Sequence, residues 1–191
     1  MALTEDSEHA TKWPPGAKRT VDGEAGGRQL SIREDFKDAL ASWASGVSIV
    51  ATRAGGLVHG VTVSSFASLS LDPPLVIACI AARSRLSPMV REARRFAISL
   101  LSADQGEASA AFARSGREPA PAFVGIDEDR TPSGMPVVAG AMAHLDCELH
   151  SELAVGDHTI LVGLVVEAVT HPDKSPLLYY RRAYRRLDAG A

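Results

Sequence analysis

The chain has 191 residues, of which 46% are hydrophobic and 23% are charged, and its formal net charge is −3. This length favours a single folded domain with a tail, because domains commonly contain ~100–200 residues. The sequence lacks the ~20 consecutive apolar residues of a membrane-spanning helix and the apolar segment of a secretory signal, so we expect no membrane partner. The slightly acidic balance argues against nucleic-acid binding, and Cys79 and Cys147 form no disulfide framework, which favours a cytoplasmic protein.

The first part of the chain is predicted to be a tail followed by a helix. Residues 1–30 are rich in glycine and charged residues and have no apolar period, so we expect them to be disordered. Ser31 and Glu34 have the spacing of a capping box, which predicts that a helix begins at Ser31 and ends at Gly46. We expect its apolar side to face the core, through Phe36, Ala39, Leu40 and Trp43.

The rest of the chain is predicted to be mainly β. Apolar runs or period-two alternation indicate strands at residues 47–52, 57–66, 75–80, 96–101, 143–153 and 159–169. The third of these is continuously apolar, which is typical of a strand buried on both faces. Short helices are expected around Pro88 and before Arg114, and residues 115–136 have the composition of an irregular loop. The antiparallel hairpin order predicts a small closed or split β-barrel with a few flanking helices.

Metal binding and nucleophilic catalysis find little support in the sequence. His144, Cys147 and His150 are three residues apart, but on a strand this spacing turns Cys147 away from both histidines. Cys79 lies within an apolar strand, where a thiol is usually inert. Neither a nucleophile elbow nor a glycine-rich dinucleotide or phosphate-binding motif occurs.

Three polar segments remain as candidate binding elements. Residues 59–66 place Thr62 and Ser64 on one face of a strand, which is either a solvated edge or a ledge for a ligand approaching Gly60. Residues 81–85 precede a helix and carry two arginines, so they form either a solvated turn or an anion site. His158 follows Gly156 and Asp157 in a turn, where a histidine is either structural or positioned for hydrogen bonding.

The order of these segments resembles the short-chain flavin reductase family over roughly residues 34–184. The most specific parts of the resemblance are the Ser70-Leu71-Asp72-Pro73-Pro74 run and the Gly156-Asp157-His158 turn. The resemblance implies an antiparallel, Greek-key-like FMN-binding split barrel at residues 31–186, followed by a short tail at residues 187–191. Members of this family include reductase components of two-component flavin-dependent monooxygenases.

The resemblance also implies an activity, partners and a set of site residues. It implies a homodimer that transfers a hydride from NADH or NADPH to FMN or FAD, and reduced flavin that diffuses to a partner monooxygenase. His158 would be the catalytic residue, placed beside the nicotinamide. The cofactor-binding residues would be Gly46, His59, Gly60, Val61, Thr62, Val63, Ser64, Ser65, Cys79, Ala82, Arg83, Ser84, Arg85, Ser99, Tyr180 and Arg181, some of them from the neighbouring subunit. Ala44, Ser45 and Ser99 depart from the residues usual in relatives and leave the flavin preference open.

Two other functions are compatible with the same sequence. One is a non-catalytic split barrel that stores or senses a flavin or haem. The other is an oxidoreductase that keeps its flavin and reduces an iron(III) chelate or a quinone.

Overall fold

A computed structural model of the protein describes residues 25–114 and 123–187, with side chains from residue 32 onward. Most of the predicted N-terminal tail, at residues 1–24, and residues 188–191 lie outside the described residues. The chain divides into two compact units, residues 1–38 and 39–191. Within the described residues, no helix has both the length and the apolar character that crossing a membrane requires.

Helix α1 (Ala25–Ala41) differs from its prediction at both ends and in its burial. It begins before Ser31 and ends before Gly46, which belongs instead to a short strand. Phe36, Leu40 and Trp43 are exposed, so the expectation that this side faces the core is wrong. Helical spacing shows which side chains share a side of the helix, but it does not show whether another element covers them.

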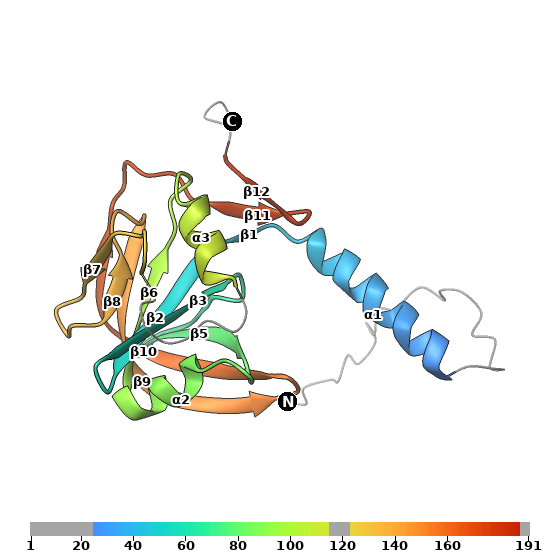
Figure 1. The fold of residues 1–191 in the computed structure, drawn as a ribbon, viewed down its shortest axis with the longest axis horizontal. Helices are drawn as coiled ribbons and strands as arrows, with labels where there is room; N and C mark the ends of the chain where they lie inside the picture. Colours follow the sequence, from blue (N-terminus) through green and yellow to red (C-terminus); the bar gives the residue numbers. More distant parts are fainter. Residues whose placement is uncertain (1–24, 115–122, 188–191) are drawn as a thin grey trace, which may run out of the picture. The chain divides into compact units, whose positions relative to one another are not determined.

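The larger unit is built around a seven-stranded antiparallel sheet in the order β3-β2-β6-β9-β10-β5-β4 (Figure 1). Its strands are β2 (Ser48–Ala54), β3 (Leu57–Val63), β4 (Ala67–Leu71), β5 (Pro74–Ala81), β6 (Arg95–Leu100), β9 (Ala143–Val155) and β10 (His158–Thr170). Strands distant in sequence are neighbours in the sheet, as the predicted Greek-key-like order requires. Strand β3 forms one edge of the sheet, and it also contacts β5, which lies next to the opposite edge. This contact curves the sheet into an open barrel. The predicted mainly β split barrel is therefore confirmed.

Smaller elements surround the barrel. A three-stranded sheet joins β1 (Ser45–Gly46), β11 (Leu178–Tyr180) and β12 (Ala183–Arg185). In the hairpin of β7 (Glu128–Arg130) and β8 (Pro136–Val138), β7 lies within the segment predicted to be irregular and β8 begins at its last residue; both strands are too short to give a sequence signal. Helices α2 (Leu86–Ala93) and α3 (Gly106–Phe112) lie at different ends of the barrel (Figure 1).

Two apolar clusters fill the larger unit, one on each face of β2. Val50 packs in the cluster that contains Phe96 and Leu161, whereas Ile49 packs in the cluster that contains Phe112. Each fully buried large apolar side chain contributes roughly 1.5–3 kcal/mol. Strand β2, unlike β5, is therefore buried on both faces.

Strand β5 has one buried face and one half-exposed face, which corrects its predicted burial on both faces. Val76, Ala78 and Ile80 are buried in the core, whereas the alternate side chains remain partly exposed. A continuous apolar run fits a strand with two buried faces, but it also fits a strand whose outer face is apolar for another reason.

Gly163 allows the core to close around Phe96. A Cβ atom on Gly163 would lie 2.5 Å from Cζ of Phe96 and 3.0 Å from Cβ of Cys147. The pairing of β10 with β9 shifts register at this point. A glycine is required here by the close approach of the aromatic ring.

Candidate functional site

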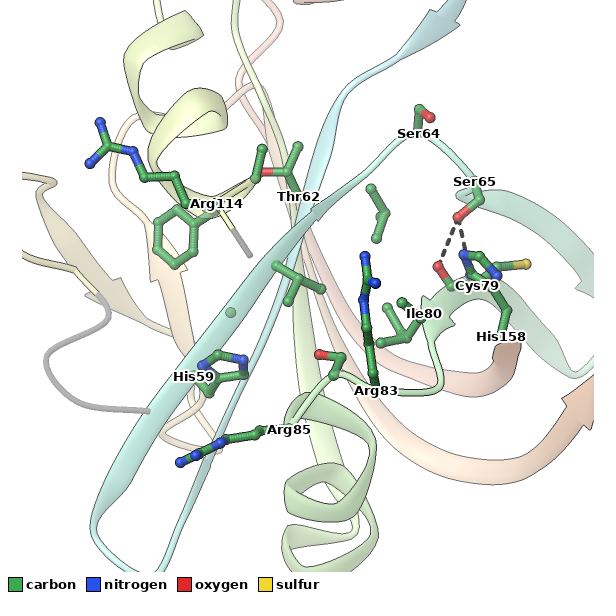
Figure 2. A pocket seen from close by; sticks show the side chains of 17 residues that line it. His59, Thr62, Ser64, Ser65, Cys79, Ile80, Arg83, Arg85, Arg114 and His158 are labelled. Carbon is green, nitrogen blue, oxygen red and sulfur yellow. Dashed lines mark hydrogen bonds between the residues drawn. The ribbon is translucent and has the colours of Figure 1, made fainter. Parts of the chain in front are cut away.

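A cavity of about 740 Å³ opens at one side of the barrel, between β3, β5 and the ends of two helices (Figure 2). This volume lies in the ~300–1,000 Å³ range of small-molecule sites. The described residues that line it include three arginines and two histidines and no aspartate or glutamate. They are His59, Gly60, Val61, Thr62, Val63, Ser64, Ser65, Cys79, Ile80, Ala81, Arg83, Ser84, Arg85, Phe112, Ala113, Arg114 and His158.

One face of β3 carries α3 at the cavity wall. The Thr62 hydroxyl donates a hydrogen bond to the carbonyl oxygen of Ser109, with 2.7 Å between the oxygens. A Cβ atom on Gly60 would lie 2.8 Å from the ring of Phe112. Gly60 therefore gives room to a helix side chain while it lines the cavity, and the Thr62 hydroxyl donates its proton to α3.

Ser65 joins the chain after β3 to β5. Its hydroxyl donates to the carbonyl oxygen of Cys79 at 3.1 Å and accepts from the Cys79 amide at 3.2 Å. Figure 2 shows this pair of bonds. Ser64 is exposed beside it. Of the three hydroxyls in this segment, Ser64 supplies the donor that the described structure leaves available to a ligand.

The turn that leads into α2 directs positive charge into the cavity. The Ser84 hydroxyl accepts a hydrogen bond from the Leu86 amide at 3.2 Å and so supports the start of the helix. Arg83 and Arg85 are both exposed, and Figure 2 shows their side chains extending in different directions from the turn. Two guanidinium groups beside a helix start form a site that favours anions.

His158 is held by its neighbour in the turn between β9 and β10. Its Nδ1 lies 2.7 Å from Oδ1 of Asp157. An ionised carboxylate only accepts hydrogen bonds, so Nδ1 carries the proton and Nε2 is the acceptor when the ring is neutral. The Ala82 amide donates to the Asp157 carbonyl oxygen at 2.9 Å, which fixes the turn against the end of β5. The His158 side chain remains 48% exposed and can reach a ligand.

Most of the predicted site residues are brought together in this cavity, but Ser99 is not. Ser99 is buried on β6, and its hydroxyl accepts a hydrogen bond from the Val138 amide at 3.0 Å. This corrects its predicted place at the cofactor, because Ser99 is 1% exposed and is not one of the residues that line the cavity.

Four other predicted residues do not line the cavity in the described chain. Gly46 pairs with Leu178 in the small sheet, and Ala82 takes part only in the turn described above. The Arg181 guanidinium lies over the ring of Tyr180, 5.3 Å from its centroid, in the hairpin of β11 and β12. Residues brought to a cavity by pairing with a neighbouring subunit would not line it in one chain.

Sequence reasoning missed the contribution of α3. Phe112, Ala113 and Arg114 line the cavity although they lie far from β3 and β5 in the sequence. The end of a predicted helix at Arg114 was the available signal, and it does not reveal which strand the helix covers.

The spacing of His144, Cys147 and His150 does not form a metal site in the structure. Cys147 is fully buried, and burial together with the neighbouring charge of Asp146 raises its pKa to about 12. Nε2 of His144 lies 2.8 Å from the carbonyl oxygen of Val138. Asp146 is also buried, where it accepts a hydrogen bond from the Ser133 amide and lies beside Arg95. Within the described residues, no group of three potential ligands is placed to hold a metal ion.

Comparison with known proteins shows what this architecture and cavity are similar to. The model of the flavin reductase like domain matches residues 40–188. The chain is 42% identical over 156 residues to the reductase component of 4-hydroxyphenylacetate 3-monooxygenase from Thermus thermophilus, covering 82% of this chain and 97% of that protein. It is 43% identical over 152 residues to the FMN reductase (NADH) SmoA from Agrobacterium fabrum, covering 79% of this chain and 84% of that protein. The structure of the NADH:FAD oxidoreductase SgcE6 from Streptomyces globisporus, with NAD and FAD fragments, superposes with a TM-score of 0.78 at 31% identity, covering 84% of this chain and 96% of that one.

Proposed function

The chain belongs to the flavin reductase like domain family, and we propose that it is an NAD(P)H-dependent flavin reductase that reduces FMN or FAD for a partner monooxygenase. The observation that carries this proposal is the cavity described above. Its lining, in the described residues, combines several cationic side chains with half-buried apolar groups and has no carboxylate. A planar ligand that carries phosphate needs both features.

The residues present fit a flavin in charge and in shape. The Arg83–Arg85 turn offers guanidinium groups to a phosphate. Val61 and Ile80 offer apolar surface to a ring. Ser64 offers a hydroxyl to a polar ring edge or to the ribityl chain.

The protein needs no nucleophile of its own for this reaction, which fits a cavity whose described lining residues include no nucleophile paired with a base. When both are bound, the nicotinamide supplies a hydride and the flavin accepts it. The role of the chain is to hold the two rings in the geometry of reaction, with ~3–3.5 Å between the reacting atoms. His158 would orient the nicotinamide, because its Nε2 can accept a hydrogen bond from the carboxamide while Asp157 holds Nδ1.

The proposal includes a homodimer, supported by the outer face of the sheet. The partly exposed side of β5 pairs with the same side of β10, in the order Leu75 with Leu164, Ile77 with Val162 and Cys79 with Ile160. This apolar face adjoins the cavity, because Cys79 also lines it. A contiguous apolar face of this kind marks an interaction surface, and a second copy of the chain is the expected partner because most oligomers are symmetric assemblies of one chain.

The dimer is tested by placing a charge on that face. We expect Val162→Lys to be monomeric in sedimentation equilibrium, whereas Val124→Lys, at an exposed loop residue, remains a dimer. A folded Val162→Lys protein that keeps the mass of the wild type would contradict this interface.

The proposal also places the protein in the cytoplasm and gives the reduced flavin a free path to its partner. Both cysteines are unpaired in the structure, as a reducing compartment allows. The exposure of Arg83 and Ser64 leaves the cavity open to solvent, so a reduced flavin can leave by diffusion.

The decisive experiment measures NADH and NADPH oxidation by the full chain with FMN, with FAD and without added flavin. We expect turnover that rises with the free flavin concentration and forms one reduced flavin for each oxidised nicotinamide under anaerobic conditions. A tightly held flavin with no nicotinamide oxidation would instead identify the protein as a binder.

A further inference from the structure

Arg114 presents a third guanidinium group to the cavity, on a different element from the Arg83–Arg85 turn. It follows α3, which is held on β3 by the hydrogen bond from Thr62 to Ser109 and by the contact of Phe112 with Gly60. The side chain is exposed and lines the cavity. Figure 2 shows Arg83 and Arg114 on opposite sides of β3. The cavity therefore has positive charge at two separate places.

The described residues provide no counter-ion for Arg114. Among the described residues, the cavity lining contains no carboxylate, and Arg114 forms no hydrogen bond or ion pair with any of them. A third guanidinium group in the lining of the same cavity adds to its positive potential, which favours an anionic ligand. A mononucleotide has one phosphate group, which the Arg83–Arg85 turn already matches.

We propose that Arg114 binds a second phosphate group, so that the cavity selects a dinucleotide. This inference rests on the proposed flavin reductase function and deepens it. The second phosphate has two sources in that reaction: the pyrophosphate of FAD and the pyrophosphate of the pyridine dinucleotide. Both present the same chemistry to a guanidinium group, which forms paired hydrogen bonds with phosphate oxygens.

A purely structural role for Arg114 predicts different results. A cation just after the last turn of a helix interacts favourably with the negative end of the helix dipole. If that were its role, removal of Arg114 would lower stability and leave each ligand's affinity unchanged relative to the others.

The test compares Arg114→Ala with Arg114→Lys and with Arg130→Ala. Arg130 is an exposed arginine that does not line this cavity, so its variant controls for the loss of one positive charge. Dissociation constants for FMN and for FAD are measured without nicotinamide, and KM for NADH is then measured with FMN as the acceptor. Thermal melts and sedimentation of each variant accompany these measurements.

If Arg114 binds the FAD pyrophosphate, Arg114→Ala weakens FAD binding about five- to tenfold and leaves FMN binding unchanged. If it binds the pyridine dinucleotide, both flavin constants stay the same and KM for NADH rises by a similar factor. Arg114→Lys should restore part of either effect, and Arg130→Ala should match the wild type.

Three results for Arg114→Ala would overturn the proposal. The first is that both flavin dissociation constants and KM for NADH are unchanged, and the second is an equal loss of FMN and FAD affinity. The third is a loss of stability or of the dimer while the relative affinities for the ligands stay the same. Failure of the proposed function itself would appear separately, as a wild-type protein that does not oxidise NADH with FMN.

Discussion

Gly60 of β3 and Phe112 of α3 are in such close contact that the Phe112 ring fits only because residue 60 has no side chain. A Cβ atom on Gly60 would lie 2.8 Å from Cε1 of Phe112, 3.0 Å from its Cδ1 and 3.2 Å from Cβ of Ala51. These distances leave no space for a methyl group. The same ring lines the ligand cavity, so this contact connects the packing of α3 to the shape of the site.

We therefore expect Gly60→Ala to be destabilised by roughly 1–3 kcal/mol, the usual cost of overpacking a filled site. The displaced ring should also lower flavin affinity. Urea unfolding and flavin titration measure the two effects. Gly46→Ala is a matched control for the stability measurement, because no atom lies within 4 Å of the added methyl group. Equal stability of the two variants would show that α3 is not held in this position.

Thr62 provides the second attachment of α3. Thr62→Val keeps the shape of the side chain but removes the hydroxyl that donates to the Ser109 carbonyl oxygen. The loss should be about 0.5–1.5 kcal/mol in the free energy of unfolding. Thr170→Val, at an exposed threonine of β10, should have the stability of the wild type. A Thr62→Val protein as stable as this control would show that the hydrogen bond to Ser109 does not stabilise the position of α3.

The long hairpin of β9 and β10 could be predicted from the sequence, whereas the packing of the helices could not. Alternation or an apolar run over many residues specifies a strand, and a short turn between two such segments specifies their pairing. The exposure of Trp43 and the contact of Phe112 with Gly60 depend on elements that are distant in sequence. No local pattern contains that information.

The individual site residues also differ in whether local sequence or contacts between distant elements determine their position. The turn residues Arg83 and His158 were predicted to meet, and register explains why: His158 pairs with Ala81 at the end of β5. Ser99 was misplaced because a strand serine has the same pattern whether its hydroxyl contacts a ligand or a buried amide, here that of Val138. Arg114 was missed because only the fold of α3 brings it to the cavity.

The thiol of Cys147 should be inert in the folded protein. Burial raises its pKa to about 12, so the reactive thiolate is scarce at neutral pH. In a Cys79→Ser background we expect no reaction with an aromatic disulfide reagent under native conditions, and one reactive thiol after denaturation. Fast labelling of the Cys147 thiol in the native protein would contradict a closed core around Phe96. The Cys147→Ser variant, which retains Cys79, reports the reactivity of the thiol at the cavity edge.

Asp104 should contribute stability that depends on pH. The hydrogen bond from the Ser102 hydroxyl, 2.6 Å between the oxygens, lowers the pKa of Asp104 below its ordinary value of 3.8. The ionised form is thus favoured by folding, so the contribution is present above about pH 4 and is lost as the pH falls through the folded-state pKa. Asp104→Ala should be less stable than the wild type at pH 7 and approach it near pH 3. Urea unfolding across this range measures the difference, with the exposed Asp173→Ala as control. A difference that does not shrink at low pH would contradict this linkage.

His158 should affect the use of the nicotinamide more than the binding of the flavin. Its ring is held by Asp157 at 2.7 Å and is half exposed at the mouth of the cavity. We expect His158→Ala to raise KM for NADH about tenfold, the loss of roughly one well-placed hydrogen bond, while the flavin dissociation constant changes less. His150→Ala removes an exposed histidine of β9 that does not line the cavity, and it should leave both constants unchanged. An unaltered KM for NADH in His158→Ala would exclude a nicotinamide contact. An equal rise in both constants would place the ring against the flavin instead.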